Sequence, residues 1–137
     1  MSFISEQSKK KVPKEWLPGM KLVSNYGGGM MQYSYEIEIK EGESTMHLIS
    51  GNGESNYKRK FSSEQLNEIL RFLSEKNLDK MKTVHTGFAY DKASESIYLQ
   101  WNYEVIGASE SNSMDVEEKY RGDFNEIGAY LQTLFKK

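Results

Sequence analysis

The chain contains two histidines, His47 and His85, and no cysteine, so few of its side chains suit metal binding or nucleophilic catalysis. A zinc site needs three or four ligands at a defined spacing, and neither histidine has a second one at that spacing. The sequence also lacks the G-x-S-x-G pattern of a serine nucleophile. We therefore predict no catalytic residue, no metal and no cofactor. An enzyme with an acid–base site at His47 or His85 is the third of our functional hypotheses.

Carboxylate and amide side chains form the clearest polar pattern. They occupy alternate positions of two segments, 31–39 and 96–106, and alternate side chains of a strand share one face of a sheet. Paired carboxylates hydrolyse glycosides only at a defined separation in a cleft, which an open sheet face does not offer. We expect this face to meet water, and any further role to be recognition of another protein or a polar ligand. The candidate binding residues are Glu36, Glu38, Tyr98, Gln100, Asn102 and Glu104.

The elements that position these side chains are predicted from hydrophobic periodicity. Apolar residues at every second position predict half-buried strands over residues 31–39 and 96–106. In the second segment, Ile97, Leu99, Trp101, Tyr103 and Val105 are expected on the buried side. Shorter segments with turn residues at their ends predict further strands at about 20–26, 45–50, 55–61, 83–90 and 113–117.

Two helices are predicted from their capping residues and apolar stripes. Ser62 and Gln65 have the spacing of a capping box, and a stripe of leucine and isoleucine follows, so we place a helix at about 63–76. Asn77 suits the left-handed residue that follows a helix. Asp123 and Glu126 repeat the capping pattern, which predicts a second helix at about 124–136.

Together these elements predict an α+β fold in the order β-β-β-β-α-β-β-β-α. We expect an antiparallel sheet of about 6–7 strands with both amphipathic helices packed on one face. Residues 20–137 then form a single domain, which is within the usual size range. Residues 1–19 contain both prolines and a run of lysines, and we expect a flexible basic N-terminal arm from which Trp16 and Leu17 reach the domain.

Charge narrows the classes of partner. The 18 basic residues are outnumbered by 20 acidic ones, whereas nucleic-acid-binding proteins usually carry a basic excess. No segment is long and apolar enough to span a membrane, and no signal-peptide core is present at the N-terminus. We expect a soluble cytoplasmic protein, or an exported one if a leader has been removed, with neither a nucleic-acid nor a membrane partner. The sequence leaves the oligomeric state open.

The leading functional hypothesis is a non-catalytic binding or protein-interaction module that uses the polar face of its sheet. The absence of catalytic motifs and the alternating carboxylates favour it. The second hypothesis is an inhibitor or immunity-type protein that neutralises a partner enzyme or toxin by covering a basic site, since the chain is small and its net charge is −2.

Overall fold

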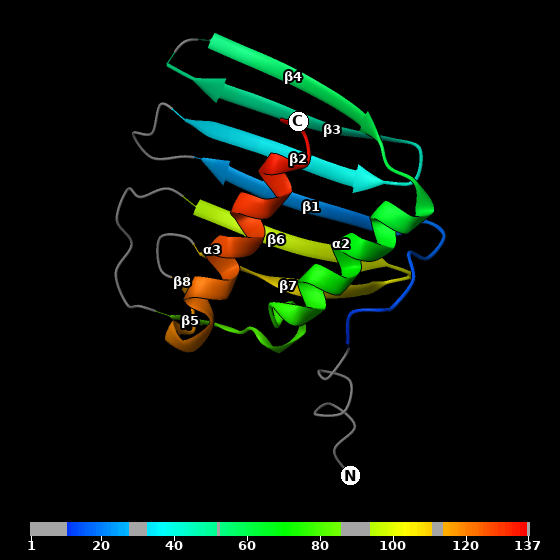
Figure 1. The fold of residues 1–137 in the computed structure, drawn as a ribbon. Coiled ribbons are helices and arrows are strands. Elements are labelled where there is room, and N and C mark those ends of the chain that lie inside the picture. Colours follow the sequence, from blue (N-terminus) through cyan, green and yellow to red (C-terminus); the bar gives the residue numbers. More distant parts are fainter. Residues whose placement is uncertain (1–10, 28–32, 52, 86–93, 111–113, 137) are drawn as a thin grey trace.

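Six strands form an antiparallel sheet in the order β4-β3-β2-β1-β6-β7, and two helices cross one face of it (Figure 1). The computed structural model describes residues 11–27, 33–51, 53–85, 94–110 and 114–136. The strands are β1 (Lys21–Gly27), β2 (Ser34–Lys40), β3 (Glu43–Ser50), β4 (Gly53–Lys60), β6 (Ser94–Trp101) and β7 (Glu104–Glu110). Strands β5 (Thr83–His85) and β8 (Met114–Val116) pair separately, and the helices are α2 (Ser63–Glu75), the short 3-10 helix η1 (Leu78–Lys80) and α3 (Glu118–Thr133). The predicted α+β class and the placement of both helices on one face are confirmed.

Helix α2 begins and ends as its sequence predicts. The Gln65 backbone N–H donates to Ser62 Oγ at 3.1 Å, and the Ser62 N–H donates to Gln65 Oε1 at 2.8 Å, which completes the capping box. After the helix, Asn77 adopts the left-handed conformation with φ of 64°, and Leu78 returns to the core.

Helix α3 begins at Glu118 rather than at 124, so the prediction of Asp123 as its N-cap is wrong. The first turn is closed by a hydrogen bond from the Tyr120 N–H to the Glu117 carbonyl at 2.9 Å. Residues 118–121 contain no helix breaker, so the helix can start before Asp123. The Asp123 side chain instead accepts a hydrogen bond from Asn77 Nδ2 at 2.9 Å. Asp123 therefore joins α3 to the end of α2 instead of capping a helix.

The predicted single strand over residues 96–106 is two strands joined by a tight turn. Asn102 and Tyr103 have φ values of 43° and 67°, the signs required by a type I′ hairpin turn, and Trp101 pairs with Glu104. Val105 was expected on the buried side of the strand, but it is exposed. Beyond the turn the buried residues are Ile106 and Ala108. The alternation of apolar residues continues through the turn, which is why periodicity alone suggested one strand.

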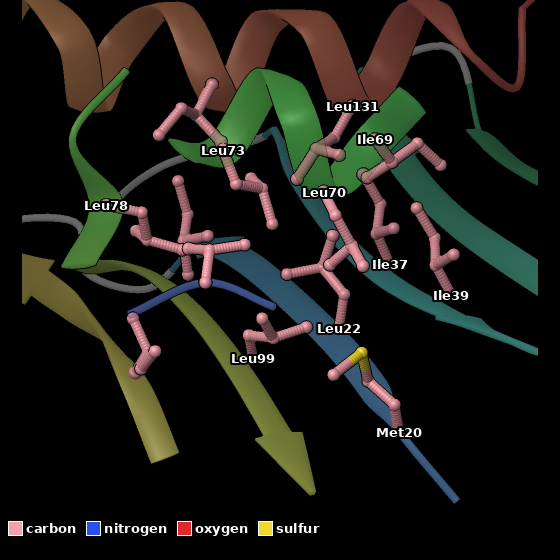
Figure 2. Packing of buried hydrophobic residues seen from close by; sticks show 14 of the residues in the cluster. Met20, Leu22, Ile37, Ile39, Ile69, Leu70, Leu73, Leu78, Leu99 and Leu131 are labelled. Atoms are coloured by element: carbon pink, nitrogen blue, oxygen red, sulfur yellow. The ribbon is translucent and has the colours of Figure 1, made fainter. Parts of the chain in front are cut away.

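The hydrophobic core lies between the sheet and the helices. Figure 2 shows Leu70 and Leu73 of α2 above Leu22, Ile37 and Leu99, which come from β1, β2 and β6. All five side chains are almost completely buried. Because successive strand residues point to opposite faces, the other face of the sheet carries the polar half of each strand.

The described part of the N-terminal segment packs on the domain. Val12 and Trp16 are buried, the Val12 N–H donates to Asp79 Oδ2 at 3.0 Å, and the Trp16 N–H donates to Asn67 Oδ1 at 2.8 Å. The packing of Trp16 on the domain agrees with expectation, and the flexible arm over residues 1–19 stays a prediction. Among the described residues, no helix has both the length and the apolar composition needed to cross a bilayer.

Candidate functional site

The open face is the side of the six-stranded sheet away from α2 and α3. Its side chains come from alternate positions of the strands, and their neighbours in the chain point into the core. Many of these side chains are exposed, including Ile49 at 38% and Val105 at 56%, as expected for a face that the helices do not cover. We define the open face by Lys21, Val23, Asn25, Glu36, Glu38, Thr45, His47, Ile49, Tyr98, Gln100 and Val105.

A shallow hollow of about 410 Å³ lies at the centre of the open face. The register of the sheet forms it, because Glu36 on β2 lies between Asn25 on β1 and His47 on β3. Glu38, two residues along, lies between Val23 and Thr45 in the same way. The hollow therefore combines two carboxylates with neutral and weakly basic groups. Its side chains are Val23, Asn25, Glu36, Glu38, Thr45 and His47.

The two glutamates of the hollow differ in their electrostatic surroundings. Glu38 lies 3.2 Å from Lys21 Nζ and 3.5 Å from Lys40 Nζ. Partial burial opposes ionisation of Glu38, but the hydrogen bonds and positive charges of the two lysines outweigh it and hold the pKa of this carboxyl below its usual value. Glu38 is thus already neutralised by its own chain.

Glu36 has no such partner among the residues that the structure describes, and its side chain is exposed. Its neighbour His47 is engaged elsewhere, since His47 Nε2 lies 2.8 Å from Oε2 of Glu54 on the edge strand β4. Glu36 is therefore the carboxylate of this hollow that remains available to an external cation.

The other half of the open face is flatter and less charged. Tyr98 lies against Gly107 on β7, where a Cβ would come within 2.6 Å of the tyrosine ring and 2.1 Å of the Ile97 carbonyl oxygen. Glycine at this position lets the ring lie along the sheet. Gln100 is exposed beside Val105, its partner across the strand pair.

The structure brings four of the six predicted binding residues together and separates two. Glu36, Glu38, Tyr98 and Gln100 lie on the open face, but Asn102 lies in the β6–β7 turn. Glu104 pairs with Trp101 and points to the side of the sheet that carries the helices. The physical reason is the type I′ turn, which reverses the chain between Gln100 and Glu104. That any of these residues binds a partner stays a prediction.

Sequence reasoning missed the neighbours that complete the hollow. Asn25, Thr45 and His47 come from β1 and β3, and only the strand register places them beside the glutamates. His47 had been singled out as a possible base, but nothing in the sequence places it beside Glu36. Within the described ranges, no three side chains of the metal-binding types are grouped closely enough to hold an ion; for His85 the structure describes the backbone only.

Comparisons with known proteins add no further constraint on the site. No family model matches this chain, and no curated protein is significantly similar to it. Function must therefore be inferred from the geometry of the described residues.

Proposed function

We propose that the chain is a non-catalytic binding module whose open face contacts a partner protein through a basic side chain of that partner. The observation that carries the proposal is Glu36, an exposed carboxylate without a described partner in the hollow. An arginine or lysine entering this hollow would form a charge-assisted hydrogen bond with Glu36 and meet the amide of Asn25. Arginine suits the position well, because its planar group has several donors.

The size of the open face fits an interface of ordinary dimensions. Strands about 4.8 Å apart and about seven residues long give a six-stranded sheet face of roughly 700 Å². Each partner in a standard protein–protein interface buries about 800 Å². Ile49 and Val105 add exposed apolar area on either side of the hollow.

A site-specific photo-crosslinking experiment tests the proposal. A photoreactive amino acid replaces Asn25, beside Glu36, and captured proteins are compared between the otherwise unchanged chain and the Glu36→Lys variant. Reversing a charge in a close interfacial pair costs about 2–5 kcal/mol, so capture should fall by at least about 30-fold. Glu75→Lys at the exposed end of α2 makes the same charge change on the opposite side and should leave capture unchanged.

Equal capture by the Glu36→Lys and Glu75→Lys variants would contradict the proposal. The inhibitor hypothesis is a special case of it, in which the captured partner is an enzyme or toxin whose basic site the open face covers. Loss of that partner's activity on adding the purified protein, and its recovery with Glu36→Lys, would support this case.

A further inference from the structure

A pocket of about 250 Å³ lies on the helix side of the sheet, away from the open face. It is formed where α3 crosses the end of the sheet that contains the last residues of β1 and the first residues of β6 (Figure 1). Three tyrosines, one carboxyl group and two amides contribute its polar atoms. The lining residues are Tyr26, Tyr33, Tyr35, Glu95, Asn125, Gly128, Ala129 and Gln132.

The three tyrosine rings form one cluster with fixed orientations. Tyr26 and Tyr35 are stacked with their centroids 5.7 Å apart, and Tyr33 meets Tyr35 edge-on at 6.3 Å. The Tyr33 hydroxyl donates to Gln132 Oε1 at 2.7 Å, and the Tyr35 hydroxyl donates to Glu95 Oε2 at 3.3 Å. Both hydroxyl protons are thereby used inside the protein, which leaves for a ligand the hydroxyl lone pairs and the parts of the three side chains that line the pocket.

Glu95 is a partly buried carboxyl group without a positive partner among the described residues. Among the described residues its hydrogen-bonding partner is the neutral Tyr35 hydroxyl, and no lysine or arginine lines the pocket. Burial raises the pKa of Glu95, and the nearby charge of Glu110 raises it further, although the Tyr35 hydrogen bond acts in the opposite direction. Glu110 is itself paired with Arg121, whose Nε donates to Glu110 Oε2 at 3.2 Å.

A glycine on α3 keeps this space open. A Cβ at Gly128 would lie 2.9 Å from Glu95 Oε2 and 3.4 Å from the Tyr35 hydroxyl oxygen. By contrast, a Cβ at Gly122 of the same helix would meet no atom within 4 Å. Glycine within a helix is destabilising, so its presence at 128 has a steric reason that its presence at 122 lacks.

We propose that this pocket binds an organic cation through an alkylammonium group, which contacts the tyrosine rings and is neutralised by Glu95. Aromatic faces attract cations through their quadrupole, and a partly buried carboxylate gains a counter-ion that none of the described residues of its own chain provides. An anionic ligand is disfavoured, because the described residues of the pocket offer acceptors and a carboxyl group but no basic side chain. The volume is below that of pockets for drug-sized molecules, so it suits a head group or the end of a side chain.

Titration with choline, observed through the tyrosine resonances in NMR spectra, tests this proposal. The matched neutral probe is 3,3-dimethyl-1-butanol, in which carbon replaces the charged nitrogen. We expect choline to bind with a dissociation constant on the order of 1 mM and the neutral alcohol to bind at least about ten-fold more weakly. Glu95→Gln, which keeps the size of the side chain and an acceptor for Tyr35, should weaken choline binding at least about ten-fold.

Two further variants distinguish an effect at the pocket from a general effect of replacing a glycine in α3. Gly128→Ala should reduce choline binding by its steric contact with Glu95, whereas Gly122→Ala should bind choline as the unchanged chain does. A third probe, Nα-acetyl-lysine amide, distinguishes the source of the ammonium group: binding of this probe but not of choline supports the proposal with a lysine side chain of another protein as the ligand.

Equal binding of choline and its neutral analogue would overturn the proposal. So would unchanged binding in a Glu95→Gln variant whose circular dichroism shows a normal fold, or absence of binding by both ammonium probes. These outcomes are independent of the open-face proposal, because Glu36 lies on the other side of the sheet from this pocket.

Discussion

The β6–β7 turn places Tyr103 in a backbone conformation that a tyrosine rarely adopts. Its φ is 67°, and its side chain is fully exposed with a relative accessibility of 107%. Left-handed backbone costs a residue with a Cβ about 1–2 kcal/mol, and glycine avoids this cost. Glycine also increases the flexibility of the unfolded chain, which offsets about 0.5–1 kcal/mol of that gain. We therefore expect Tyr103→Gly to raise the free energy of unfolding by about 0.5–1 kcal/mol.

Thermal unfolding followed by circular dichroism measures this effect. An unfolding entropy of about 2.1 cal/mol/K per residue gives roughly 0.29 kcal/mol/K for 137 residues, so Tm should rise by about 2–3.5 °C. Tyr103→Ala is the matched control, because it removes the ring but retains a Cβ and should give no such rise. A Tm for Tyr103→Gly at or below that of Tyr103→Ala would refute the left-handed turn and favour one continuous strand over residues 96–106.

Three further predictions concern glycines and carboxyl groups around the sheet. In urea unfolding, Gly122→Ala should stabilise by about 0.5–1 kcal/mol, whereas Gly128→Ala should stabilise by less than this, because its Cβ meets Glu95 Oε2 and the end of that side chain must shift. The pKa of Glu38 is lowered on folding, so its ionised form contributes less than about 1 kcal/mol to the free energy of unfolding. This contribution should be present above the pKa of the unfolded state and be lost as the pH falls through the pKa of the folded state. In the Glu38→Gln variant this pH-dependent loss should be absent. The pKa of Glu95 is raised, so its ionisation opposes folding as pH rises, and Glu95→Gln should stabilise the protein at about pH 8 and have little effect near pH 4.

The sequence predicted correctly those elements that are determined by residues close together in the chain. The capping box at Ser62 and the left-handed Asn77 depend on residues close in the chain, and both are confirmed. The alternation before residue 40 likewise predicted the buried positions of Tyr35, Ile37 and Ile39. For this reason the fold class and the sidedness of the sheet followed from the pattern of residue types.

The errors arose where two local signals conflicted. The capping chemistry of Asp123 suggested a helix start, but α3 continues through it from Glu118 because the preceding residues also favour helix. At Asn102 and Tyr103, a favourable asparagine is followed by tyrosine where glycine is usual, so apolar alternation outweighed the turn signal. The last residues of the predicted strand 83–90 lie outside the described ranges.

Both candidate sites depend on strand order, which local patterns do not contain. Tyr26 pairs with Tyr35 on one side and with Glu95 on the other, although Glu95 is far away in the sequence. The prediction placed Tyr35 on a buried face, and this is confirmed, but Glu95 was not singled out. Its importance becomes visible only when β1 brings β2 and β6 into one sheet.

The two carboxyl groups that we assign to ligands differ in what they imply about function. Glu36 is exposed, so water solvates its charge and its lack of a partner has no cost in stability. Glu95 is partly desolvated, and a charge in that position opposes folding until a cation neutralises it. A glutamine at position 95 would keep the acceptor for Tyr35 without this penalty, so packing alone does not explain the carboxyl group. Glu95 is therefore the stronger indicator of a ligand, and Glu36 supports the open-face proposal through its position in the hollow, not through any cost of leaving its charge unpaired.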